Sequence, residues 1–228
     1  VIISNNSNFE VSVNRIMAGK TLNAGQICLA PDYVFIPEEK KDSFVSQSKK
    51  IVTKMYPKIK DNPDYTSVIN ERHYDRLKGY ISEAKDKGIE VVEINPNNED
   101  FKQQPNHKIP PTLIINPDED LLVMKEEIFG PILPIKTYSN ISETINYINS
   151  KDRPLGLYYF GQDKKEMDKI LKNTTSGGVT INDVVFHVAQ DNAPFGGVGP
   201  SGTGSYHGIE GFKNFSHAKT VYSQTKFD

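Results

Sequence analysis

The chain has 228 residues, of which 36% are hydrophobic and 25% charged, as is ordinary for a globular protein that buries a substantial core. Its net charge of −2 gives no electrostatic footprint for nucleic acid or an anionic membrane, and no apolar run approaches the roughly 18 residues that span a bilayer. The single cysteine excludes an intrachain disulfide and a Cys-x-x-Cys site. Because the N-terminus has no pattern of a secretory signal, we expect a cytoplasmic protein.

Five stretches of the chain have the spacing of amphipathic helices, with apolar side chains three and four residues apart. In chain order they are 9–23, 38–55, 71–87, 142–149 and 164–173. Asn8 can cap the first of them at its N-terminus, and Gly88 is a natural stop after the third.

Short runs rich in β-branched and aromatic residues predict strands between these helices. In chain order they are 33–36, 90–94, 112–115, 132–138, 155–160 and 177–181, followed by an extra strand in the tail at 218–224. The polar stretch 95–109 is expected to be an exposed loop. Strands that alternate with helices favour one domain of the α/β class, with three layers and a largely parallel sheet.

Cys28 is the first candidate for chemistry, because it follows a helix-like stretch and stands among small and polar neighbours. Ala24 and Gly25 permit a tight turn, where free backbone N–H groups can activate a thiolate and hold an oxyanion. A lone cysteine is as readily an inert buried residue, so the residues alone leave both interpretations open. A Cys–His hydrolase is a further alternative. Its candidate bases are His73, His107, His187, His207 and His217, which are too scattered to indicate a metal site.

Two other segments have ambiguous patterns. Residues 197–202 match Gly-x-Gly-x-x-Gly, but Pro200 interrupts the pattern and no acid stands about 20 residues later, so we reject a dinucleotide fingerprint. The run Lys125-Glu-Glu-Ile-Phe-Gly-Pro131 can present a carboxylate and a ring to a ligand. From the residues alone, a charged turn with Phe129 in the core is the simpler interpretation.

Four ordered segments together resemble the aldehyde dehydrogenase superfamily, and the likeness covers essentially the whole chain. They are Gly19-Lys-Thr-Leu-Asn-Ala-Gly-Gln-Ile-Cys28, Lys125-Glu-Glu-Ile-Phe-Gly-Pro131, Ser176-Gly-Gly-Val-Thr-Ile-Asn-Asp183 and Pro194-Phe-Gly-Gly-Val-Gly199. The sequences that follow Cys28 and Gly199 are similar to the class 3 branch, and segments 182–187 and 215–219 are most like its coniferyl-aldehyde dehydrogenases. The resemblance implies the fold of the family's catalytic domain.

The resemblance also implies a reaction and roles for particular residues. Cys28, as the thiolate, would attack the aldehyde carbonyl, and its own backbone N–H would supply half of the oxyanion hole. Oxidation with NAD or NADP would leave a thioester that water hydrolyses to the carboxylic acid, and no metal is implied. Glu127 would hydrogen-bond the nicotinamide ribose, and Phe129 would pack near the nicotinamide. The residues implied for the aldehyde pocket are Asn182, His187 and Phe195.

The chain departs from the family pattern upstream of Cys28. The family's general-base glutamate lies in a Glu-Leu-Gly-Gly-Lys motif, which does not occur among the 27 residues before Cys28, and the oxyanion-hole asparagine and Rossmann-like cofactor domain are likewise not found. We therefore expect residues 1–217 to be a catalytic domain that is inactive alone, with most of the cofactor site in a missing N-terminal domain. Family members are dimers or tetramers, and residues 218–228 are expected to be an assembly segment.

A non-enzymatic alternative is a naturally short binding or assembly module on the same fold. The trio Cys28, Glu127 and Phe129 argues against it, since nothing else in such a module needs all three. Reading the coding sequence upstream of Val1 would separate the two hypotheses, because an in-frame Glu-Leu-Gly-Gly-Lys motif would exclude the module.

Overall fold

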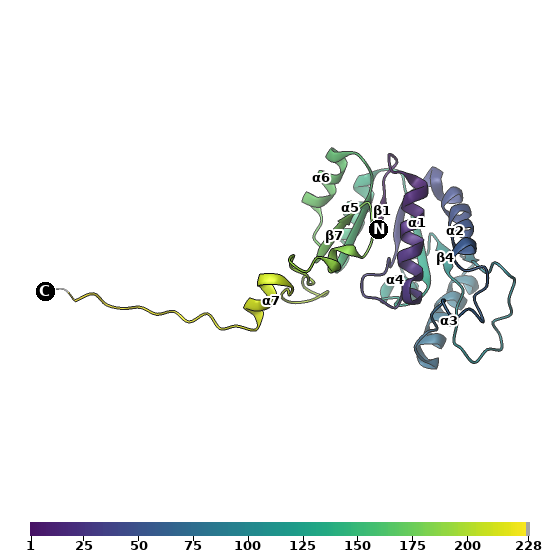
Figure 1. Ribbon diagram of the computed structural model, residues 1–228. Helices are drawn as coiled ribbons and strands as arrows, with labels where there is room; N and C mark the ends of the chain where they lie inside the picture. The colour runs from purple at the N-terminus through teal and green to yellow at the C-terminus, as the bar shows by residue number, and fades with distance from the viewer. Residues whose placement is uncertain (227–228) are drawn as a thin grey trace.

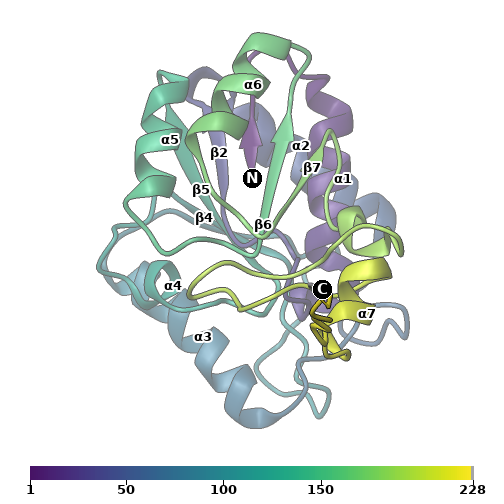
Figure 2. The same cartoon turned by 90° about the vertical axis from the view of Figure 1, so that its left-hand side faces the viewer.

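The computed structural model describes residues 1–226 and arranges them around one seven-stranded sheet with helices on both faces (Figures 1 and 2). The strands are β1 (Ile2–Ile3), β2 (Val34–Pro37), β3 (Val91–Glu93), β4 (Thr112–Ile115), β5 (Ile132–Tyr138), β6 (Gly156–Phe160) and β7 (Gly178–Ile181). The α-helices are α1 (Phe9–Thr21), α2 (Lys41–Met55), α3 (Glu71–Asp86), α4 (Leu122–Lys125), α5 (Ile141–Asn149), α6 (Lys164–Asn173) and α7 (Gly208–Asn214). Short 3-10 helices lie at Leu22–Gly25, Glu38–Lys40 and Phe186–Ala189.

The strands lie in the order β3-β4-β5-β2-β1-β6-β7, and each neighbouring pair is parallel except β3 with β4. This arrangement confirms the predicted α/β class with a largely parallel sheet. The central strand β1 is absent from the prediction because two residues are too few to show a period. Ile2 nevertheless pairs with Phe35 of β2 on one side and with Tyr159 of β6 on the other.

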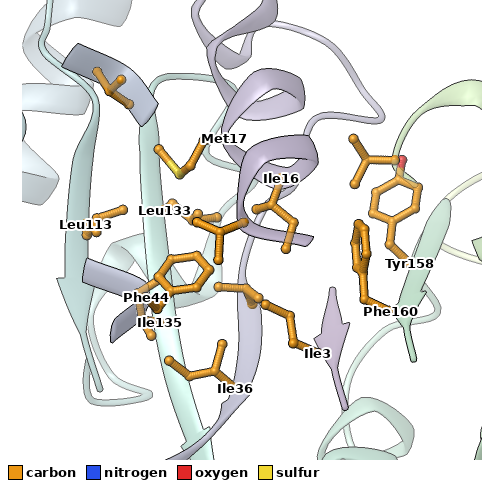
Figure 3. Packing of buried hydrophobic residues seen from close by; sticks show 14 of the residues in the cluster. Ile3, Ile16, Met17, Ile36, Phe44, Leu113, Leu133, Ile135, Tyr158 and Phe160 are labelled. Carbon is orange, nitrogen blue, oxygen red and sulfur yellow. The ribbon is translucent and has the colours of Figure 1, made fainter. Parts of the chain in front are cut away.

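Helices cover both faces of the sheet and give three layers. Successive residues along a strand point to opposite faces, and β2 and β4 are buried along their whole length, so both faces of the sheet are covered. One face packs against α1 and α2, and Figure 3 shows Ile16, Met17 and Phe44 of these helices beside Leu133 and Ile135 of β5. The other face packs against α5 and α6, and beside β4 and β5 it packs against α3. This core holds the loops at the edges of the sheet in place.

Side-chain caps determine where several helices begin. Asn8, Asn70 and Asp163 accept hydrogen bonds from backbone N–H groups in the first turns of α1, α3 and α6. The first predicted helix ends early, at Thr21, because residues 23–25 have left-handed backbone angles. The helix boundary therefore lies just before the loop that carries the cysteine.

The tail differs from the prediction. Residues 218–224 form no strand, and after α7 the described chain runs through 216–226 as a single extended segment that points away from the domain (Figure 1). A strand requires a partner for its backbone N–H and C=O groups, and residues 1–226 offer none beside this segment. Val221 and Tyr222 are accordingly 78% and 81% exposed. The predicted strand 218–224 is therefore wrong within the described residues. Of the tail segment 218–228, the last two residues, 227–228, lie outside the described part.

Candidate active site

A cleft of about 770 Å³ lies at one edge of the sheet and is lined by segments that are far apart in sequence. Cys28 precedes β2, Glu127 and Phe129 precede β5, and Pro154 precedes β6. Because these strands are parallel, their first residues share the amino-terminal edge of the sheet. Parallel pairing therefore gathers three loops into one site.

The loop that carries Cys28 leaves α1 through a sharp turn. Asn23, Ala24 and Gly25 have φ angles of 49°, 51° and 73°, so three consecutive residues are left-handed. Such angles are costly for alanine and persist only where the surrounding structure enforces them, which is frequent at functional sites. The turn leaves the side chain of Cys28 exposed in the cleft.

The thiol of Cys28 has no imidazole partner. Within residues 1–226 no histidine lines the cleft, and no hydrogen bond joins a histidine to Cys28. The Cys–His hydrolase alternative therefore lacks the contact that it requires.

Two glycines allow the Cys28 loop to touch the segment that precedes β5. A Cβ at Gly25 would lie 2.3 Å from the carbonyl oxygen of Gly130, whereas real Cβ atoms almost never approach another heavy atom closer than 3.0 Å. The backbone N–H of Ile128 adds a hydrogen bond of 3.2 Å to Oδ1 of Asp32. The spacing between the nucleophile loop and the Glu127–Phe129 segment is thus set by backbone contact.

Glu127 and Phe129 both line the cleft. Phe129 has a φ of 48°, which is rare for a bulky residue, and its side chain is 42% exposed, so the interpretation that placed it in the core is wrong. Burial raises the pKa of Glu127, the negative charge of Asp32 raises it further, and the positive charge of Arg76 opposes both effects. A half-exposed ring beside a carboxylate suits a ligand with a flat apolar part and hydroxyl groups.

Lys20 and Asp32 are charged residues of the same cleft that the sequence interpretation missed. Lys20 is only 1% exposed, and burial lowers its pKa to about 8, against the opposing effect of the Asp32 charge. Burial raises the pKa of Asp32, against the opposing effects of Lys20 and of the Ile128 N–H. Lys20 lies one helical turn after the buried Met17, so the spacing along the helix is a signal that could have placed it inside.

An aromatic cluster lies beside the nucleophile loop and contains two of the predicted pocket residues. Tyr158 donates a hydrogen bond of 2.7 Å to the carbonyl of Leu29, the residue after the nucleophile. The ring of Tyr158 lies 6.0 Å from that of His187, which lies 5.8 Å from that of Phe195, and His207 stacks on Phe195 at 5.9 Å. Burial lowers the pKa of His187. Of these rings only Tyr158 directly lines the cleft.

Asn182, the third predicted pocket residue, is not brought to the cleft. It follows β7, at the carboxyl-terminal edge of the sheet, where its side-chain amide exchanges hydrogen bonds of 2.9 and 3.1 Å with the backbone of Gly161. Arg15 donates a hydrogen bond to its carbonyl. In this structure Asn182 joins the ends of β6 and β7, and we do not include it in the pocket.

Two kinds of feature are not found among residues 1–226. No helix in this range combines the length and the apolar character needed to cross a bilayer. The same residues contain no group of three or more His, Cys, Asp or Glu side chains placed to hold a metal ion.

The profile of the aldehyde dehydrogenase family matches residues 1–221. The chain is 57% identical over 228 residues to a protein of Caulobacter vibrioides named a probable coniferyl aldehyde dehydrogenase, and 53% identical over 225 residues to the coniferyl aldehyde dehydrogenase of a Pseudomonas species. These alignments cover 100% and 99% of the chain but 47% of each relative, so the chain spans about half the length of the curated relatives it matches. A solved structure of Staphylococcus aureus AldH in a substrate-bound state is 35% identical, with a TM-score of 0.89 over 100% of this chain and 48% of that one. The chain belongs to the aldehyde dehydrogenase family.

Proposed function

We propose that this chain is the catalytic part of an NAD(P)-dependent aldehyde dehydrogenase that oxidises coniferyl aldehyde, or a similar aromatic or long-chain aldehyde, to its carboxylic acid. The observation that carries the proposal is the cleft in which the exposed Cys28 lies together with Glu127 and Phe129. Since the chain spans about half the length of its relatives, the activity is proposed for the protein that contains it.

Cys28 is the proposed nucleophile. As the thiolate, its Sγ forms a bond to the aldehyde carbon while the carbonyl electrons move to oxygen, which gives a thiohemiacetal. The N–H of Cys28 has no acceptor among residues 1–226 and is free to donate a hydrogen bond to this oxygen. Loss of hydride leaves a thioester, and water then releases the carboxylic acid and restores the thiol.

The residues of the cleft fit a nicotinamide cofactor in their chemistry. When bound, NAD or NADP supplies the hydride acceptor. Glu127 offers a carboxylate that accepts hydrogen bonds from ribose hydroxyls, and Phe129 offers an exposed ring face against which a flat heterocycle can pack. Both residues lie in the same cleft as the nucleophile, as hydride transfer requires.

An aromatic aldehyde is favoured by the names of the two relatives and by the cluster beside the nucleophile loop. His187 and Phe195 would form the wall of the aldehyde pocket together with Tyr158. Because its pKa is lowered, the His187 imidazole is neutral at pH 7, and its Nε2 has no partner among the described residues. That nitrogen is itself buried, so His187 would contribute to the pocket wall through its packed ring.

We assign neither a general base nor the second oxyanion donor to this chain. Hydrolysis of the thioester requires a base that activates water, and we propose that a part of the protein outside these 228 residues supplies it. We also propose assembly into a dimer or tetramer through the tail, whose Val221 and Tyr222 are 78% and 81% exposed.

The decisive experiment compares this chain with the protein translated from the full coding sequence. Each is mixed with coniferyl aldehyde and, separately, with NAD⁺ or NADP⁺, and the formation of reduced nicotinamide is followed. We expect sustained turnover by the longer protein and none by the 228-residue chain. A longer protein that oxidises no aromatic or long-chain aldehyde would contradict the function, and sustained turnover by the short chain would contradict the assignment of the base elsewhere.

Glu127→Gln is expected to lower kcat/KM for the cofactor by about 10- to 100-fold, because the amide keeps the shape of the side chain but loses the charge-assisted hydrogen bond. The measurement is initial rate against cofactor concentration at saturating aldehyde. Glu90→Gln, an exposed carboxylate outside the cleft, is the matched control and should leave the rate unchanged. Equal rates for Glu127→Gln and Glu90→Gln would exclude a role of Glu127 in binding the cofactor.

A further inference from the structure

One face of α3 holds the whole segment that carries Glu127 and Phe129. The side chain of Leu77 packs so tightly on Gly130 that a Cβ there would lie 2.5 Å from it. Further along the helix, Glu83 accepts a hydrogen bond of 3.0 Å from the N–H of Leu122, which lies at the start of the same segment. The segment is thus held at both ends by one helix.

Between these two contacts, Arg76 binds the backbone of the segment directly. Its guanidinium donates hydrogen bonds of 3.1 Å to the carbonyl of Glu127 and 2.6 Å to the carbonyl of Ile128. It also donates to the hydroxyl of Tyr80 at 2.6 Å, and that hydroxyl donates to the Glu126 carboxylate at 2.5 Å. One arginine therefore fixes two consecutive carbonyls directly and a third residue of the segment through Tyr80.

The backbone next to these carbonyls needs such a restraint. Phe129 has a φ of 48°, a conformation that costs on the order of 1 to 3 kcal/mol for a residue of this kind unless the surroundings enforce it. A guanidinium presents several N–H donors in a rigid plane, so it can bind two neighbouring carbonyls at once. A lysine ammonium is a point charge and does not reproduce that geometry.

We propose that Arg76 is a positioning residue that holds Glu127 and Phe129 in the arrangement that the nicotinamide cofactor requires. The inference rests on the proposed function, because only that function assigns Glu127 and Phe129 to a cofactor site. Arg76 touches the backbone of the segment and acts on the cofactor only through it. Its positive charge additionally opposes the rise in the pKa of Glu127, and so favours the ionised carboxylate.

The first test follows hydrogen exchange of the backbone amides in the 228-residue chain. Arg76→Met should speed exchange at residues 126–130 by about 10- to 100-fold, as expected when hydrogen bonds to a charged group are lost. Arg72→Met is the matched control, since Arg72 lies one turn earlier on α3, is exposed, and its guanidinium makes no hydrogen bond or ion pair within residues 1–226. Exchange at 126–130 that is the same in both variants would overturn the proposal.

The second test uses the longer protein and separates positioning from general damage. Arg76→Met should raise KM for the cofactor and lower kcat, each by about tenfold, while alkylation of Cys28 by iodoacetamide changes by less than about twofold. Arg76→Lys keeps the charge but cannot bridge two carbonyls, so it should retain most of the defect. Full activity of Arg76→Lys, or an equal loss of Cys28 alkylation, would overturn the positioning role. A wild-type protein without turnover would refute the proposed function, and the exchange test would still decide whether Arg76 holds the segment.

Discussion

Cys28→Ala is expected to lower kcat/KM for aldehyde oxidation by about 10⁴-fold or more, as loss of a catalytic nucleophile commonly does. The substitution removes the atom that forms the bond to the aldehyde carbon, and no second cysteine of this chain can replace it. The measurement is the rate of reduced-nicotinamide formation by the longer protein with coniferyl aldehyde.

The fold should survive this change, so the loss can be assigned to chemistry. Cys28 is exposed and lies outside the helices and strands, and we expect the free energy of unfolding to change by less than about 0.5 kcal/mol. Chemical denaturation of the two proteins side by side provides the control. A variant of normal stability that still turns over would remove Cys28 from the mechanism.

Gly25→Ala is expected to destabilise the chain by about 3 kcal/mol, the sum of backbone strain and steric overlap. At this position φ is 73°, and a Cβ would lie 2.3 Å from the carbonyl oxygen of Gly130. The carbonyl belongs to the backbone and can move away only if the Glu127–Phe129 segment separates from the nucleophile loop. We therefore expect the dehydrogenase activity of the longer protein to fall together with the free energy of unfolding.

Gly88→Ala is a matched control for the same substitution. Gly88 also has a φ of 73°, but a Cβ there would meet nothing within 4 Å. Gly88→Ala should lower the free energy of unfolding by the backbone strain alone, about 1 to 2 kcal/mol, and should leave the activity unchanged. If the two alanine variants lose equal stability and equal activity, the contact between Gly25 and Gly130 does not hold the site together.

The sequence predicted the fold through those helices and strands that are long enough to show a hydrophobic period. Alternating strand and helix patterns predicted the α/β class, and six of the predicted strands overlap β2 to β7. Strand β1 could not be predicted, because Ile2 and Ile3 become a strand only through pairing on both sides with β2 and β6. The predicted tail strand did not form for the opposite reason, since its sequence pattern is suitable but residues 1–226 offer no strand for it to pair with.

The sequence predicted the motif residues of the candidate site but not the residues that surround them. Resemblance named Cys28, Glu127 and Phe129, and the structure brings all three to one cleft. Open α/β sheets usually bind ligands at the carboxyl ends of their strands, whereas this cleft lies at the amino ends. The sequence contained a signal for this, because Cys28 and Glu127 both precede predicted strands. Contacts such as those of Arg76 depend on tertiary packing that no local pattern shows.

The direction of the helices gives this edge of the sheet an electrical polarity. Helices α1 and α5 end next to the cleft, since Lys20 and Ile148, both in last turns, are among its lining residues. The C-terminal end of a helix carries partial negative charge, which stabilises a nearby cation by roughly 0.3 to 1 kcal/mol. Under the proposed function, the two helix ends therefore favour the positively charged oxidised nicotinamide over its neutral reduced form. Such a bias would favour release of the reduced cofactor and its exchange for an oxidised one, and the backbone itself would supply it.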